Sequence, residues 1–177
     1  MSDSQPVLRP ATRDDLPAIN AIYNHEIEFG VATWDYDHWT IEAREAWFDA
    51  RTPEEPVLVV DLDGHVAGFG YLSWYRSKIG YRFTREDSLY LVPTYQRRGI
   101  GARLLEALIE QAKSIGIHTL IAQIESSNEA SITLHQNFGF ELLGLERQVG
   151  YKFDRWLDAQ PMQLLLPSGG PTEDERA

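Results

Sequence analysis

The chain has 177 residues, of which 43% are hydrophobic, so it can form one globular domain with a substantial core. A formal net charge of −11 makes nucleic acid and anionic membranes poor partners, and the absence of cysteine excludes disulfides and thiolate metal sites. No apolar run is long enough to span a membrane, and the start lacks a signal-peptide pattern, so we expect a cytoplasmic protein.

Hydrophobic periodicity predicts about seven strands and four helices. Thr12 or Asp14, then Thr40, and then Asn128 or a preceding serine can cap three of the helices, and Asp63-Gly64 supplies the angles of a tight hairpin turn. In chain order we expect a strand at 7–9, helices at 13–29 and 40–51, strands at 57–61, 65–75 and 89–92, a helix at 100–113, a strand at 119–124, a helix at 128–139, and strands at 140–146 and 162–166.

This order predicts an α/β (α+β) domain built on a mixed central sheet. We expect the domain to cover residues 7–166. A flexible N-terminus at 1–6 and a flexible acidic tail at 167–177 complete the expected organisation.

The junction between the strand at 89–92 and the following helix has the sequence Gln96-Arg97-Arg98-Gly99-Ile100-Gly101. No Lys-Ser or Lys-Thr pair follows it, so it is not a P-loop, and Leu104 occupies the place of the third glycine of a dinucleotide fingerprint. Free amides and the positive end of a helix dipole would still attract a phosphate, and glycines would let it approach. The simpler alternative is a glycine turn beside two solvated arginines.

The full string Val92-Pro93-x-x-Gln96-x-x-Gly99-x-Gly101 resembles the acetyl-CoA motif of the GCN5-related N-acetyltransferases, the GNAT superfamily. This resemblance implies that the amides from about Arg97 to Ala102 hold the pyrophosphate of acetyl-CoA. It also implies that the strand at Leu91 and Val92 pairs with the pantetheine arm. The implied cofactor-binding residues are Leu91, Val92, Gln96, Arg97, Arg98, Gly99, Ile100, Gly101, Ala102, Asn128 and Ser131.

The segment NEASITLHQNFGF resembles the second motif of the same superfamily. Asn128, Ser131 and His135 are spaced i, i+3 and i+7, so they share one helical face that could follow an extended ligand. Most of the superfamily has tyrosine where this chain has His135, and that departure indicates a subfamily.

Three segments, FTREDSLYLVPTYQRRGIG, IESSNEASITLH and QVGYKFDRWLD, together resemble the phosphinothricin and methionine sulfoximine acetyltransferases. The resemblance covers residues 7–166. It implies a mostly antiparallel GNAT sheet, a homodimer without a metal, and transfer of acetyl from acetyl-CoA to the amine of a small amino acid or glutamate analogue. The alternatives are a transferase for another amine (a polyamine, a peptide N-terminus or an aminoglycoside) and a CoA-binding sensor without catalysis.

Acetyl transfer needs a neutral amine, so a base helps. Glu86, expected just before the cofactor strand, matches the glutamate of the phosphinothricin enzymes, although a solvated loop carboxylate is the alternative. His135 could protonate the leaving thiolate or relay a proton, although a lone helical histidine is more often structural. The amide of Leu91 or Val92 is expected to polarise the acetyl carbonyl.

An amino-acid acceptor carries a carboxylate, which arginine binds through a bidentate fork. Arg76 is the first candidate and Arg82 the second. Four aromatic side chains, Trp34, Trp74, Tyr75 and Phe83, could form walls of the acceptor site, although such aromatics are more often core residues. Because the family resemblance implies a dimer with the acceptor site near its interface, these side chains could act partly across it.

Overall fold

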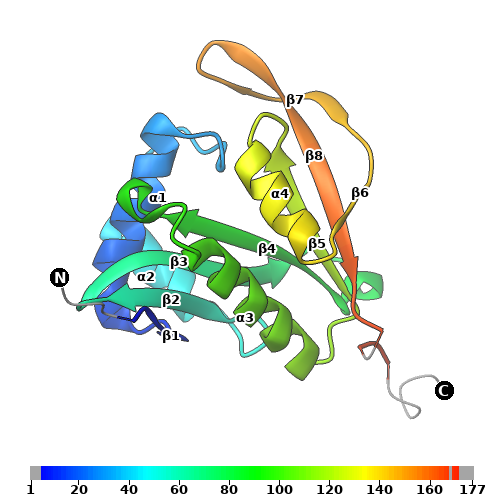
Figure 1. Ribbon diagram of the computed structural model, residues 1–177, viewed down its shortest axis with the longest axis horizontal. Helices are drawn as coiled ribbons and strands as arrows, with labels where there is room; N and C mark the ends of the chain where they lie inside the picture. The colour runs from blue at the N-terminus through cyan, green and yellow to red at the C-terminus, as the bar shows by residue number, and fades with distance from the viewer. Residues whose placement is uncertain (1–4, 168, 172–177) are drawn as a thin grey trace.

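An eight-stranded sheet forms the centre of the computed structural model, which describes residues 5–167 and 169–171 (Figure 1). The strand order is β1-β2-β3-β4-β5-β8-β6, and β7 pairs with β8 beside this path. Every pairing is antiparallel except that of β4 with β5. The strands are β1 Val7–Pro10, β2 Val57–Leu62, β3 His65–Trp74, β4 Thr84–Leu91, β5 Thr119–Glu125, β6 Glu141–Leu142, β7 Glu146–Lys152 and β8 Arg155–Leu165.

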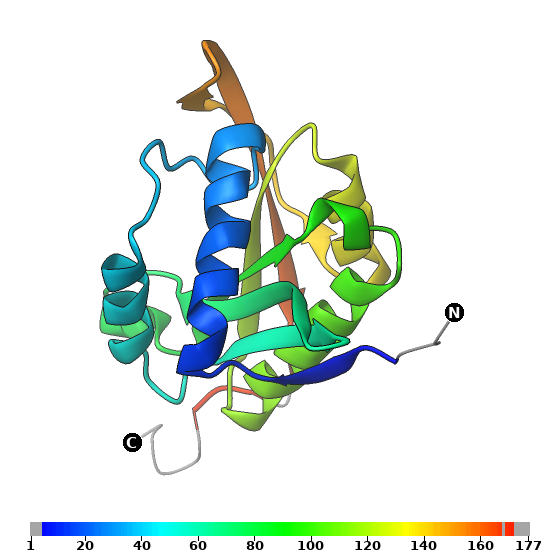
Figure 2. The ribbon, with the colours of Figure 1, turned by 90° about the vertical axis from the view of Figure 1, so that its left-hand side faces the viewer.

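Four α-helices cover the two faces of the sheet, as predicted. Helices α1 (Leu16–Phe29) and α2 (Ile41–Asp49) lie on one face, and α3 (Ile100–Ser114) and α4 (Glu129–Asn137) lie on the other (Figures 1 and 2). Short 3-10 turns occupy Arg13–Asp15, Ile79–Tyr81 and Pro93–Tyr95. None of the helices in the described part of the chain is long and apolar enough to cross a membrane.

The expected caps are present at α2 and α4. The Thr40 side chain accepts a hydrogen bond from the Ala43 amide at 3.2 Å, and Asn128 Oδ1 accepts one from the Ser131 amide at 3.1 Å. Each bond satisfies an amide that lacks a carbonyl one turn earlier. Thr12 instead begins the 3-10 turn ahead of α1 and forms a capping box with Asp15.

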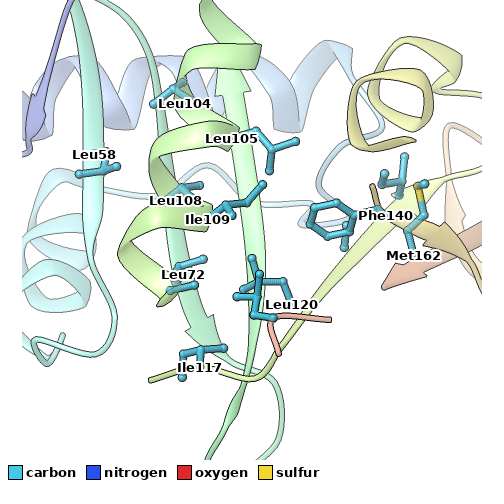
Figure 3. Packing of buried hydrophobic residues seen from close by; sticks show 14 of the residues in the cluster. Leu58, Leu72, Leu104, Leu105, Leu108, Ile109, Ile117, Leu120, Phe140 and Met162 are labelled. Carbon is cyan, nitrogen blue, oxygen red and sulfur yellow. The ribbon is translucent and has the colours of Figure 1, made fainter. Parts of the chain in front are cut away.

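Each face of the sheet has its own hydrophobic core. Under α3 and α4, Leu104, Leu105 and Leu108 are fully buried against β2 to β5, and Phe140 and Met162 extend this cluster toward β8 (Figure 3). Under α1, a second cluster is rich in aromatic rings. The two cores hold the central strands from both sides, which makes β4 and β5 a rigid support for a site.

The end of the chain departs from the predicted strands. We expected single strands at 140–146 and 162–166, but β6 has two residues, and a β7–β8 hairpin that was not predicted extends away from the rest of the sheet (Figure 1). Its turn residues Phe153 and Asp154 both have positive φ values, of 53° and 55°. The expected Asp63-Gly64 turn also has two consecutive positive φ values. The Phe153-Asp154 turn contains no glycine, so the sequence did not predict it.

Strands β4 and β5 are paired over only three residues. The parallel register joins Thr84–Glu86 to Thr119–Ile121 and then stops. Beyond Glu86 the two strands separate, so a gap opens in the middle of an otherwise continuous sheet. This gap is where the cavities described below are found.

The domain boundaries stay predictions. Within the expected tail, the Gly170 amide donates to the Gly116 carbonyl at 3.0 Å, and Gly169 contacts His118. Residues 1–4, 168 and 172–177, which include most of both expected flexible segments, lie outside the described part of the chain.

Candidate active site

Two adjoining cavities occupy the gap between β4 and β5. The larger has a volume of about 450 Å³ and the smaller about 50 Å³. Ser88 and Tyr90 of β4 and residues 123–125 of β5 line both. A space of a few hundred Å³ suits a small-molecule ligand.

Glu86 lies on the wall of the larger cavity and is half-buried. The sequence suggested a position in a loop before the strand, but Glu86 lies inside β4. Burial, with a smaller contribution from the neighbouring Asp87 charge, raises the pKa of Glu86 to about 7. A carboxyl group with this pKa can accept and release a proton near neutral pH, as a general base requires.

His135 is buried at the smaller cavity with both ring nitrogens engaged. Nε2 lies 3.0 Å from Oδ2 of Asp87, and Nδ1 lies 2.7 Å from the Ser131 carbonyl oxygen, which can only accept. Burial acts to lower the His135 pKa, but the hydrogen bond and charge of Asp87, with the Ser131 carbonyl, raise it overall. His135 therefore forms a buried ion pair with Asp87, and neither nitrogen is free to meet a thiolate in this arrangement.

The expected pyrophosphate turn lies at the start of α3 and is exposed from Gln96 to Gly99. Gly99 has φ 76°, and no heavy atom lies within 4 Å of the position that its Cβ would occupy. The first helical hydrogen bond runs from the Arg103 amide to the Gly99 carbonyl at 3.1 Å, so the preceding amides have no carbonyl one turn back. An open backbone with unpaired amides fits a diphosphate.

The two glycines of the turn differ in their surroundings. A Cβ on Gly101 would lie 3.3 Å from Leu134 and 3.4 Å from Leu91, on the buried side of the helix. Gly101 therefore allows α3 to approach α4 and β4, whereas Gly99 leaves the solvent side open.

Leu91 and Val92 present their amides in opposite directions. The Val92 amide donates to the Ala67 carbonyl at 3.0 Å and is therefore used within the β3–β4 pairing. Because alternate amides of a strand point to opposite edges, the Leu91 amide points toward the gap. Of the two candidate donors for an acetyl carbonyl, Leu91 is the one that the β3–β4 pairing leaves available.

Asn128 and Ser131 line the smaller cavity together with His135, so the structure brings the face of the second motif to the gap. Asn128 positions the helix through its cap, and Ser131 holds His135 through its carbonyl. The residues from Gln96 to Ala102 do not line either cavity and lie at the neighbouring end of β4, at the start of α3.

The candidate acceptor residues are not brought to the cavities of this chain. The Arg76 guanidinium lies 4.9 Å from the Tyr75 ring and 5.6 Å from the Tyr81 ring, in the exposed connection between β3 and β4. Arg82 covers Phe83 at 4.5 Å in the same connection. Among the described residues, the lining of the larger cavity instead contains three carboxylates, those of Glu86, Glu125 and Glu146, and no arginine or lysine.

Several lining residues were missed by sequence reasoning. They come from the loop after α1, from β3 and from β7, and they include Ala32, Thr33, Tyr71, Glu146 and Val149. Trp34, an expected wall residue from the aromatic loop at 31–40, does line the larger cavity. Nothing in the sequence placed that loop opposite β7.

Among the residues that the structure describes, no group of three or more His, Asp or Glu side chains could hold a metal ion. The free amides at the α3 turn suit an organic anion, and Glu86 at the cavity can accept a proton. These features correspond to the two needs of acyl transfer from an acyl-CoA.

Comparisons with known proteins agree with this arrangement. Residues 8–160 match the Acetyltransferase (GNAT) domain family. The chain belongs to this family. It is therefore an acyltransferase with a GNAT fold.

Three similar proteins give the comparison its detail. An L-methionine sulfoximine/L-methionine sulfone acetyltransferase of Pseudomonas paraeruginosa is 44% identical over 161 residues, which are 90% of this chain and 94% of that protein. The structure of a phosphinothricin acetyltransferase from Sinorhizobium meliloti in complex with AcCoA has a TM-score of 0.90 and 38% identity, covering 95% of this chain and 94% of that one. A ribosomal-protein-alanine N-acetyltransferase from Brucella melitensis has a TM-score of 0.88 and 42% identity, covering 90% and 99%.

Proposed function

We propose that this protein transfers acetyl from acetyl-CoA to the amine of a small amino acid or glutamate analogue, of the phosphinothricin or methionine sulfoximine type. The observation that carries the proposal is Glu86, a carboxyl with a pKa of about 7 on the wall of a cavity of about 450 Å³. The acceptors named for the two similar acetyltransferases support the substrate class.

The bound cosubstrate supplies an activated acetyl group, and the residues of this chain position it and move the proton. Amides around Gly99 hold the diphosphate, with Arg97 and Arg98 adding positive charge. The Leu91 amide donates to the carbonyl oxygen as negative charge develops on it. Glu86 takes a proton from the ammonium form of the acceptor, directly or through one water, so that the neutral nitrogen attacks the thioester carbon in a ternary complex. The C–N bond forms, the C–S bond breaks and CoA leaves as a thiolate, and the second proton of the nitrogen passes to this thiolate or to solvent.

The pKa of Glu86 sets the expected pH dependence. Its carboxylate form is the base, so turnover should rise with pH through about 7. The folded-state pKa lies above the ordinary value of 4.5, so the folded state binds more protons between these two values. Stability therefore falls as pH rises through that window, which is the cost of holding the base in the cavity wall.

We propose further that the protein works as a homodimer and that Arg76, with Tyr75, Arg82 and Phe83, binds the acceptor carboxylate across the interface. The larger cavity has no cation of its own, and Arg76 is exposed, which supports a contribution from a second copy. A cytoplasmic location, and the absence of nucleic-acid, membrane and metal partners, remain part of this proposal.

A second candidate acceptor is the N-terminal amine of a polypeptide. The ribosomal-protein-alanine N-acetyltransferase among the similar structures favours it. A peptide lacks a free carboxylate beside the reacting amine, so it would not need Arg76. This difference separates the two candidates.

The test is acetyl-CoA consumption with a panel of amino acids, a polyamine, an aminoglycoside and an alanine-starting peptide, in the wild type and in Arg76→Ala. For an amino-acid acceptor, Arg76→Ala should raise the acceptor KM by about 10–150-fold, since a charge-assisted hydrogen bond contributes about 1.5–3 kcal/mol. The KM for acetyl-CoA should stay unchanged. If the wild type prefers the peptide and Arg76→Ala does not change the KM for it, the second candidate replaces the proposal. If Arg76→Ala changes the KM for the acceptor and the KM for acetyl-CoA equally, Arg76 does not bind the acceptor carboxylate.

A further inference from the structure

Lys152, the last residue of β7, is a buried lysine whose ammonium group is held by backbone carbonyls. Only 3% of its surface is exposed. Its Nζ donates to the carbonyls of Gly30 and Thr33 at 2.8 Å each and to that of Glu26 at 3.3 Å. In the described part of the chain no carboxylate lies within ion-pair distance of it.

The position of these carbonyls explains why a charge can be buried there. Glu26 lies in the last turn of α1, where the helix dipole is negative, and its carbonyl accepts from the Gly30 amide at 2.9 Å as well as from Lys152. Burial lowers the pKa of Lys152, with the Glu26 and Asp35 charges opposing the shift. A buried ammonium group must keep its hydrogen-bond partners, so these three bonds tie β7 to the end of α1 and the loop after it.

Two further contacts join the same two segments. The Tyr36 hydroxyl donates to the Tyr151 carbonyl, and the Trp34 ring packs so closely on Gly150 that a Cβ there would overlap it. The loop after α1 and the β7 strand are more than a hundred residues apart in the chain, so tertiary contacts such as these set the distance between them.

Both segments form walls of the larger cavity. Val31, Ala32, Thr33 and Trp34 contribute from the loop, and Glu146 and Val149 contribute from β7. The distance between the loop and β7 is therefore also the width of the cavity. The Lys152 ammonium lies where the loop and β7 meet, a contact region that we call the joint, and Lys152 does not line the cavity itself.

We propose that Lys152 is a positioning residue of the acceptor site, which sets the width of the larger cavity by joining β7 to the end of α1 and so determines which acceptors fit. The inference rests on the proposed function, because it assigns this cavity to the acceptor. It deepens that function by naming what controls the choice among amines.

The experiment compares Lys152→Met with Lys113→Met, the same change at an exposed ion pair on α3. Using the amine that the wild type acetylates best, together with a smaller and a larger analogue, we expect Lys152→Met to raise the acceptor KM by about 10–100-fold. Discrimination among the three sizes should weaken. Acetyl-CoA affinity, measured by calorimetry without acceptor, should stay within about twofold, and Lys113→Met should match the wild type.

A purely structural lysine would lower the melting temperature and leave the acceptor KM and the size preference of the folded variant unchanged, which would overturn the proposal. If Lys152→Met does not fold, Tyr36→Phe and Gly150→Ala alter the same joint; unchanged acceptor KM in both would equally overturn it. Failure of the proposed function is recognised separately, since the wild type would then bind acetyl-CoA but acetylate no amino acid of the panel.

Discussion

The proposed cofactor end and the proposed acceptor end of the gap between β4 and β5 are built in different ways. The cofactor end uses contiguous chain, residues 91–102, and one face of α4. The acceptor end combines the loop at 31–34, Tyr71 of β3 and residues of β7. A local motif is therefore enough to suggest where the cosubstrate binds, whereas the larger cavity forms only when distant segments pack together.

The largest effect is expected at Glu86, where the two ends meet. Glu86→Gln preserves size but removes basicity, so turnover should fall by about 10²–10⁴-fold with acetyl-CoA affinity nearly intact. The rise of turnover with pH near 7 should change, because the group that causes it is gone. The free energy of unfolding of the wild type falls between pH 4.5 and about 7, and this fall should be smaller in Glu86→Gln.

Stopped-flow or steady-state kinetics, with Glu106→Gln on the exposed side of α3 as control, measure the effect of the Glu86 change. A loss below about tenfold would mean that the amine releases its proton to bulk water without help from Glu86.

The next largest effect is expected on acetyl-CoA affinity alone. Gly99→Asp adds a negative charge where a diphosphate must approach, and like charges in contact cost several kcal/mol, so acetyl-CoA affinity should fall about 100-fold. Gly64→Asp is a matched control, since Gly64 also has a positive φ (79°) and an empty Cβ position but lies at the β2–β3 turn. Calorimetry on folded variants decides: equal affinities in the two variants would remove Gly99 from the phosphate site.

A smaller effect should come from the Asp87–His135 pair, because Asp87 is the charged neighbour of Glu86. Asp87→Asn removes a negative charge and should move the acid limb of the rate profile to lower pH, by less than about one unit. His135→Gln leaves Asp87 uncompensated and should move that limb to higher pH. The other ionisable groups lining the cavity with Glu86 are Tyr71, Tyr90, Glu125 and Glu146, and both variants leave them in place.

Rate–pH profiles of the two variants test this directly. Shifts in the same direction would contradict an electrostatic role for the pair. Loss of turnover at all pH values in His135→Gln alone, without a shift, would support the proton relay that the sequence suggested for His135.

The smallest effect is expected at the β7–β8 turn, on stability rather than activity. Asp154 has φ 55°, which an L-residue adopts at a cost and glycine adopts freely, so Asp154→Gly should raise the free energy of unfolding by roughly 0.5–1 kcal/mol. Gly64→Ala, at the equivalent β2–β3 turn, should lower it by a similar amount. Thermal unfolding measures both, and a destabilised Asp154→Gly would show that the Asp154 side chain contributes more than its backbone strain costs.

The sequence by itself determined most elements and the family. Periodicity located the four helices, Asp63-Gly64 located the first hairpin, and the turn around Gly99 indicated acetyl-CoA binding, because each of these signals depends on residues close together in the chain. Local capping by Thr40 and Asn128 likewise followed from residue types alone.

The remaining features depend on contacts between distant segments. The first half of β4 was hidden because Arg85, Glu86 and Asp87 read as a charged loop; in the fold, Arg85 stacks on Trp74 at 3.7 Å and donates to carbonyls, and Asp87 pairs with His135. The β7–β8 hairpin was hidden because its turn lacks glycine. At β4 the partners that compensate for the buried charges are distant in the chain, so no window of the sequence contains both the cost and its compensation.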